Sequence, residues 1–213
     1  MAHARSLSAV LLALVSACSP APAPRPLPAA APSASAFAEP STGWEHGAWG
    51  RFHSLRHDVW LPLPDGRGWA IDDHKGEWLV ATHAASTSVL RLRSLHEDHA
   101  QSHAKCEASA RAKDPSLPRE DQGRVIATTD DVLPGWDAHA VALIIPRQGA
   151  VEGHVTVFAA NVRRCLVVHF ATRSSARDAE AVVGVRLGDI TDLVRKITPE
   201  DERSGPGREP PPR

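Results

Sequence analysis

Hydrophobic residues in the middle of the chain come in short runs, and some of these alternate with polar positions at a period of two. In the run SVLRLR, Leu90 and Leu92 share one face while Arg91 takes the other, which is typical of a half-buried β-strand. Turn signals such as Pro-Asp-Gly separate the runs. The pattern predicts strands at 58–64, 68–72, 77–83, 88–93, 139–145, 154–160 and 165–172.

Two stretches have helical character instead. Residues from about 95 to 113 are rich in alanine, contain no Gly or Pro and stop at Asp114-Pro115, so they predict a helix. Near the C-terminus, one apolar stripe recurs at the spacing of a helix that packs on a sheet. Its members are Val183, Leu187, Ile190, Val194 and Ile197. Gly184 and Gly188 either weaken this helix or allow it to approach the sheet closely.

The order of these elements is strands, a helix, three strands and a helix. It predicts an α+β fold, with an antiparallel-rich sheet of about six or seven strands and two main helices. This order, together with the segment LPLPDGRGWAIDD at 61–73, resembles the Mog1/PsbP-like α/β/α sandwich over most of 55–197. The resemblance implies a binding or assembly factor rather than an enzyme, although a fold alone does not assign a function.

A different pattern stands at the N-terminus. Residues 1–6 carry one positive charge, 7–15 are apolar, and Ser16-Ala17-Cys18 follow, an arrangement that resembles the lipobox of bacterial lipoproteins. The apolar run of about nine residues is much too short to span a bilayer. The alternative is an ordinary secretory signal peptide, cut near Ala17 or in the alanine-rich stretch that follows.

The lipobox resemblance has specific consequences. It implies that residues 1–17 are removed and that the thiol of Cys18 carries a diacylglyceryl group, with a further acyl chain on the new amine. More than one acyl chain gives stable membrane anchoring. Ser19, the residue after the cysteine, implies the outer membrane rather than the inner one.

Proline dominates the segment after Cys18, where it alternates with Ala and Ser. Such a sequence favours an extended, polyproline-like backbone and contains nothing apolar enough to fold. The C-terminal tail PEDERSGPGREPPPR is charged and rich in Pro and Gly, so it is also expected to be unfolded. The predicted organisation is a signal peptide at 1–17, a lipidated and disordered tether at 18–42, one globular domain at 43–198 and a disordered tail at 199–213.

Neither the net charge nor a known sequence motif indicates a ligand or a catalytic site. The formal net charge is -1 and the pI is about 6.9, so no global field recruits nucleic acid. Gly66-Arg67-Gly68 precedes a predicted strand rather than a helix and therefore indicates a turn, not a dinucleotide site. Asp72, Asp73 and Glu77 could supply an acidic pair for hydrolysis, but a hydrated rim on a turn explains them better.

Cysteine usage suggests a disulfide. If Cys18 carries a lipid, Cys106 and Cys165 remain, and an isolated pair in an oxidising envelope favours a bond between them. Such a bond would join the first helix to a central strand, and closing a loop of ~60 residues stabilises by about 4 kcal/mol in the chain-entropy model. The alternatives are two free buried thiols or a redox-active pair. The absence of a Cys-x-x-Cys motif argues against a redox function.

The histidines suggest a metal site. On a helix, His99 and His103 would lie about 40° apart, which makes a two-point site for zinc or copper. His169 would be a third ligand if the helix and its strand run antiparallel. If they run parallel, His169 is carried toward Lys113 and the site does not form. The alternative is that these histidines are ordinary amphipathic residues at a helix–sheet edge.

The aromatic residues are unusual, with six Trp, four Phe and no Tyr. Trp44, Trp49 and Trp60 cluster near the start of the domain, which predicts an aromatic and basic surface for a glycan or protein. The residues that accompany them are Phe52, His53, Arg56 and His57. The alternative is that these aromatics only strap the first segment of the domain to the core.

These observations favour an envelope lipoprotein, anchored to the membrane through Cys18, whose α+β domain is a non-enzymatic binding or assembly module. Its partner would be an envelope protein or glycan rather than nucleic acid, and it would need no cofactor. The alternative is a metal-dependent periplasmic enzyme or metal carrier that uses His99, His103 and His169 with zinc or copper. A purely structural spacer is a third hypothesis.

Overall fold

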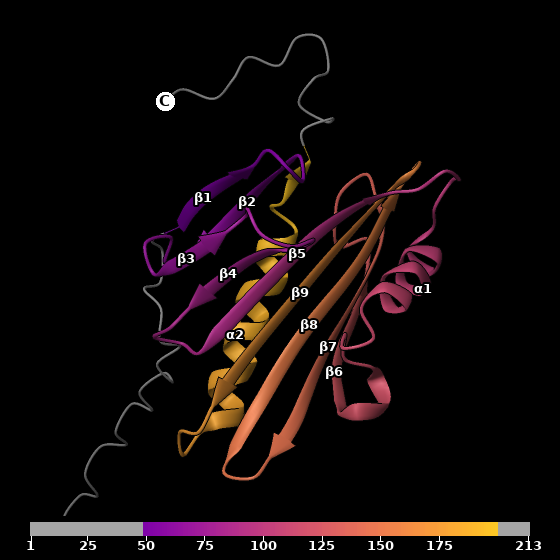
Figure 1. Ribbon diagram of the computed structural model, residues 1–213. Helices are drawn as coiled ribbons and strands as arrows, with labels where there is room; N and C mark the ends of the chain where they lie inside the picture. The colour runs from indigo at the N-terminus through magenta and orange to yellow at the C-terminus, as the bar shows by residue number, and fades with distance from the viewer. Residues whose placement is uncertain (1–48, 200–213) are drawn as a thin grey trace, which may run out of the picture. The chain divides into compact units, whose positions relative to one another are not determined.

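Seven strands form the main sheet of the computed structural model, which describes residues 49–199 (Figure 1). The strand order is β3-β4-β5-β9-β8-β7-β6, and all neighbouring strands are antiparallel. Their bounds are β3 Trp69–Asp72, β4 Leu79–His83, β5 Ser88–His96, β6 Arg124–Asp130, β7 Asp137–Arg147, β8 Ala150–Asn161 and β9 Arg164–Ser174. The predicted α+β class, with an antiparallel sheet and two main helices, is confirmed.

A second, smaller sheet has the order β1-β2-β10. It consists of β1 (Trp49–Ser54), β2 (Val59–Pro64) and β10 (Thr198–Pro199). Pairing of Thr198 with Trp60 brings the two ends of the described chain to one sheet. Pro199, the first residue of the predicted tail, is the last residue of β10.

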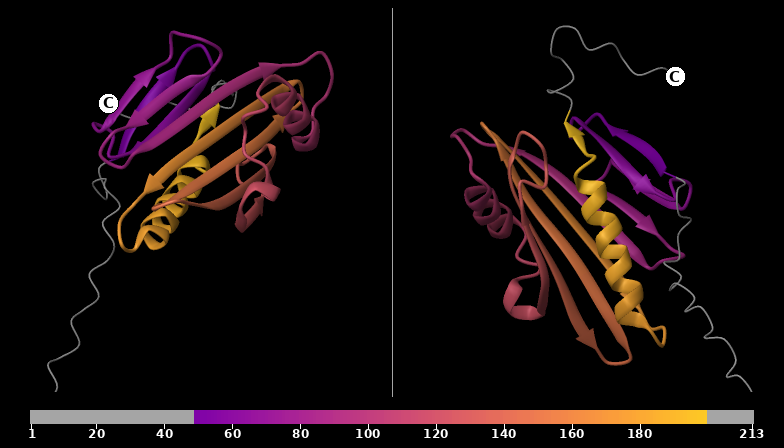
Figure 2. Two further views of the ribbon diagram at one scale, coloured as in Figure 1. Left: turned by 60° about the horizontal axis from the view of Figure 1, so that its bottom comes forward. Right: turned by 180° about the vertical axis from the view of Figure 1, so that it is seen from behind.

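The two α-helices cover opposite faces of the main sheet, as Figure 2 shows from two sides. Leu166 and Val168 of β9 pack in one buried cluster with the apolar stripe of α2 (Ala179–Val194). Cys165 and Val167 alternate with them and pack in a second cluster with α1 (His103–Lys113). This alternation follows from the two-residue period of a strand and produces three layers. A short 3-10 helix, Glu120–Gln122, precedes β6.

The stripe on α2 is buried as predicted, but the close approach to the sheet has a different origin. Gly184 and Gly188 face open space, because a Cβ at either would meet nothing within 4 Å. Gly153 of β8 instead provides the room: a Cβ there would lie 2.3 Å from Cγ1 of Val183. Of the two roles predicted for Gly184 and Gly188, close approach to the sheet is therefore wrong, and a weakening of the helix stays a prediction.

The predicted start of the first helix is also wrong. Strand β5 continues to His96, since Leu95 pairs with Cys165 across the sheet. Helix α1 begins at His103, after the N-cap Ser102, whose hydroxyl accepts a hydrogen bond from the amide of Lys105. Pairing with β9 overrides the local helix propensity around residue 95.

Some strands carry no periodic signal in the sequence. Almost all of β6 is exposed, so this edge strand lacks the alternation that identifies a half-buried one. Within residues 49–199 no helix is both long and apolar enough to cross a membrane. Cys18, the predicted signal peptide at 1–17 and the predicted tether at 18–42 lie outside the described residues.

Candidate functional site

Alternating side chains on β1 divide between the core and the outer surface of the small sheet. Phe52 packs against the core, while Trp49 and Arg51 occupy the other parity and are exposed. His53 shares their parity and lies directly opposite Trp60 of β2 in the strand register. The small sheet therefore presents aromatic and basic residues on the side that faces away from the core.

Two cation–ring groups make up this surface. The rings of His53 and Trp60 stack with centroids 4.4 Å apart and planes 5° from parallel, and the Arg51 guanidinium lies 5.0 Å from the Trp60 ring. Lys196 holds its Nζ 4.1 Å from the ring of Trp49, which is 40% exposed. Cation–π contacts at exposed sites stabilise by about 0.5–1 kcal/mol each. We call these five residues the aromatic–cationic face.

Among the five residues of this face, Arg51 and Lys196 are the permanently charged side chains, and both are cations. Strands β1, β2 and β10 contain no Asp or Glu, so no carboxylate on these strands neutralises Arg51. Lys196, which follows α2, adds a second exposed cation.

Arg56 and His57, which were also predicted for this surface, do not belong to the aromatic–cationic face. The Nε of Arg56 lies 3.5 Å from Oδ1 of Asp73. His57 is buried and its Nδ1 accepts a hydrogen bond from the amide of Ser94 at 3.2 Å. Burial, and after it the charge of Arg56, lowers the pKa of His57 to about 4, so this ring is neutral near pH 7. Trp44 lies outside the described residues.

The acidic residues proposed for hydrolysis are not brought together as a pair. Asp72 accepts hydrogen bonds from the amides of His74 and Lys75 within its own turn, and the first of these bonds lowers its pKa. Asp73 pairs with Arg56. Glu77 reaches Nη1 of Arg93 at 2.7 Å. Each carboxylate thus either accepts hydrogen bonds within its turn or forms an ion pair with an arginine.

The cysteines and the glycine-rich turn lie as the sequence suggests. Cys106 of α1 and Cys165 of β9 form a disulfide with an S–S distance of 2.06 Å, which ties the helix to the sheet. Gly68 donates its amide to the carbonyl of Asp65 at 2.8 Å, which closes the turn between β2 and β3. This turn precedes a strand, so it lacks the helix N-terminus of a dinucleotide site.

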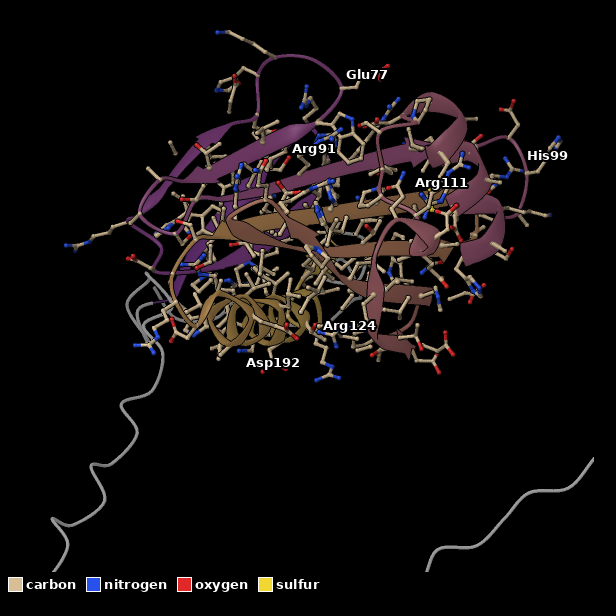
Figure 3. All side chains as sticks on the ribbon, turned by 90° about the horizontal axis from the view of Figure 1, so that it is seen from below. Glu77, Arg91, His99, Arg111, Arg124 and Asp192 are labelled. Atoms are coloured by element: carbon tan, nitrogen blue, oxygen red, sulfur yellow. A yellow bond between two sulfur atoms is a disulfide. The ribbon has the colours of Figure 1, made fainter. Side chains whose placement is uncertain are left out.

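The predicted three-histidine site does not form. His99 projects from the loop before α1 rather than from the helix (Figure 3), because β5 continues to His96 and delays the helix. His103 opens α1, and His169 lies on β9, stacked on His154.

The relative direction of α1 and β9 explains why His169 stays apart. His169 lies opposite Arg91 in the sheet, and Arg91 forms an ion pair with Asp114, the C-cap of α1. The strand and helix therefore run in the same sense, and His169 is carried toward the Lys113 end of α1. Among residues 49–199, no group of three or more His, Cys, Asp or Glu side chains is placed to hold a metal ion.

A buried polar network around His83 was not visible in the sequence. The Nε2 of His83 lies 3.1 Å from Oδ2 of Asp65, and its Nδ1 lies 2.8 Å from the hydroxyl of Ser86. The order of acid, imidazole and hydroxyl is that of a hydrolase, but Ser86 is only 1% exposed and cannot meet a substrate. Its hydroxyl donates onward to Ser88, which in turn donates to Thr172.

Comparisons with known proteins identify no family. No protein family matches the chain, and no curated protein matches it. A solved structure from Bacteroides thetaiotaomicron VPI-5482 is 9% identical with a TM-score of 0.44, over 76% of this chain and 50% of that chain. This chain therefore spans about half the length of that protein.

LpqN, described as involved in cell envelope biogenesis of Mycobacterium tuberculosis, is another similar structure. It is 18% identical with a TM-score of 0.37, over 70% of this chain and 89% of that chain. Similarity at this level assigns neither a ligand nor an activity to the present chain. The resemblance to the Mog1/PsbP-like sandwich stays a prediction.

Proposed function

We propose that this chain is a lipid-anchored protein of the bacterial envelope, and that its α+β domain binds an anionic envelope glycan without catalysing a reaction. The observation that carries the proposal is the aromatic–cationic face. There Arg51 of β1 lies over the indole ring of Trp60, and Lys196, which lies between α2 and β10, lies over that of Trp49. Strands β1 and β2 contain no carboxylate. Cations attract the anionic groups of the glycan, and the partly exposed ring of Trp49 can pack on a sugar.

The arrangement of the other chemical groups supports binding rather than catalysis. His57 and His83 are buried, and both are held by neighbouring backbone or side-chain groups. Asp72, Asp73 and Glu77 are bound to separate amides or bases. A catalytic base must reach the proton that it abstracts, and these buried rings do not meet that requirement.

The anchor is tested separately from the ligand. Expressed in a bacterial host, the chain should partition into the membrane fraction, and its first mature residue should carry the mass of a lipidated cysteine. Cys18→Ala should release the protein into the soluble fraction. The double variant Cys106→Ala/Cys165→Ala serves as the matched control and should stay membrane-bound. Soluble wild-type protein would contradict the anchor.

The ligand is tested by sedimentation of the detergent-solubilised full chain with purified, protease-treated cell-wall sacculi. We expect Trp49→Ala and Arg51→Ala each to lower the affinity by about tenfold, equivalent to roughly 1.4 kcal/mol, because Trp and Arg are enriched among the few residues that dominate binding. Binding should weaken as salt is raised, because exposed charges are screened. Arg177→Ala, which replaces an exposed basic residue between β9 and α2, should bind as wild type.

Unchanged sedimentation of the Trp49 and Arg51 variants would contradict the role of the face. Loss of all sedimentation after protease treatment of the sacculi would show that the ligand is an envelope protein, which would overturn the glycan proposal.

A further inference from the structure

Two histidines lie side by side on the α1 face of the main sheet, away from the aromatic–cationic face. His103 is the first residue of α1 and His139 lies on β7. Their ring centroids are 5.5 Å apart, with planes inclined by 28°. Their side chains are 37% and 24% exposed, respectively, so both rings are accessible to solvent.

Each ring is oriented by its own carboxylate. The Nδ1 of His103 lies 2.7 Å from Oδ1 of Asp137, and the Nδ1 of His139 lies 2.7 Å from Oδ1 of Asp130. An ionised carboxylate only accepts hydrogen bonds, so each Nδ1 carries the hydrogen and the neutral ring keeps a lone pair on Nε2. A histidine that donates from one nitrogen to a carboxylate while the other binds metal is the usual arrangement in metalloproteins.

The backbone holds these four residues in fixed positions. Asp130 and His139 are directly opposite each other in the β6–β7 register. Asp137 lies two residues before His139 on the same side of β7, and its second oxygen accepts the backbone amide of His103 at 3.0 Å.

We propose that His103 and His139 together bind one zinc or copper ion through their Nε2 atoms, with Asp137 and Asp130 orienting the rings. With a Zn–N bond of about 2.0–2.1 Å, two imidazoles on a tetrahedral ion have centroids roughly 5 Å apart. The observed separation of 5.5 Å is close to this distance. Because the protein supplies two nitrogen ligands, the remaining coordination positions are open to water or to a ligand from outside.

This site differs from the one expected from the sequence, and it does not depend on the proposed glycan binding. It shares only His103 with the earlier set, since His99 lies on a loop and His169 is buried on β9. Imidazole ligands suit both zinc and copper, so the two metals serve as alternative probes of one site.

The test is a calorimetric titration of the full chain with Zn²⁺, repeated with Cu²⁺. We expect one ion per chain, with affinity reduced at least about tenfold in His103→Ala and in His139→Ala. Asp130→Ala, which removes only an orienting group, should weaken binding by about 10–100-fold. His99→Ala is the matched control and should bind as wild type. Thermal unfolding of each variant checks that it folds.

A spectroscopic readout separates the site from nonspecific binding. Electron paramagnetic resonance of the Cu²⁺ complex should show hyperfine coupling from two imidazole nitrogens in the wild type and from one in each alanine variant. The proposal is overturned if the full chain shows no saturable binding. It is equally overturned if folded His103→Ala and His139→Ala variants bind the metal as tightly as wild type.

Discussion

His154 and His169 stack on adjacent strands of the main sheet, with their planes 3° from parallel and Nδ1 of His154 3.3 Å from Nε2 of His169. Burial lowers the pKa of His154. Burial, and after it the neighbouring His154, lowers the pKa of His169 to about 3. Both rings are therefore neutral in the folded protein near pH 7, and a charge on either is costly because little water reaches the pair.

This pair predicts acid-sensitive stability. Below about pH 6.5 the unfolded chain protonates these histidines, whereas the folded chain does not until the pH approaches the lowered values. The unfolded state then binds more protons, so the free energy of unfolding falls as the pH falls, by up to about 1.4 kcal/mol per pH unit for each such proton. Buried His57 adds to the effect in the same direction.

Urea unfolding between about pH 7 and pH 4.5 measures this slope. His169→Gln should flatten the dependence, since glutamine does not titrate. A stability profile of His169→Gln that parallels the wild type would contradict the assignment to this pair.

The disulfide predicts a second effect on stability. Cys106 and Cys165 are separated by 59 residues, and in the chain-entropy model a loop of this length stabilises by about 4 kcal/mol. The double variant Cys106→Ala/Cys165→Ala should lose roughly 2–5 kcal/mol in the free energy of unfolding. Chemical denaturation measures this loss, and a reductant should destabilise the wild type but leave the double variant unchanged. Equal stability of the two proteins would disprove the contribution.

The contact between Gly153 and Val183 predicts a steric effect. A Cβ at 153 would lie 2.3 Å from Val183, so Gly153→Ala should push α2 from the sheet and cost about 1–3 kcal/mol. Adding Val183→Ala should restore part of the loss, as a double-mutant cycle would show. Gly188→Ala is the control: its Cβ meets nothing within 4 Å, so it should stabilise by about 0.5–1 kcal/mol. Additive losses in the cycle would contradict the proposed contact.

Val162 predicts a stabilising substitution. This exposed, β-branched residue has a φ of 50° in the turn between β8 and β9, a conformation that valine rarely adopts. Asparagine tolerates it better, so Val162→Asn should raise the free energy of unfolding by about 1 kcal/mol. The same change at exposed Leu55, which lacks a positive φ, should stay within about 0.5 kcal/mol of wild type. Calorimetry measures both, and a destabilised Val162→Asn would refute the argument.

Part of the candidate site was predictable from the sequence. The number of tryptophans and the basic residues beside Trp49 and Trp60 indicated an aromatic and basic surface. The sequence could not separate Arg51, which lies over Trp60, from Arg56, which turns to Asp73. That difference depends on strand parity and on the loop that contains Asp73, which lies 17 residues after Arg56 (73 − 56). Neither has a local signal in the sequence.

By itself, the sequence determined the α+β class, the order of most elements and the apolar stripe of α2, because strand and helix periods are local properties of the chain. It also singled out Cys106 and Cys165 as the pair to join. Only the tertiary structure decided that β5 extends to His96, that the rings of His103 and His139 lie side by side, and that α2 packs closely against Gly153. These relations arise from strand register and helix direction, which depend on contacts between residues far apart in the chain.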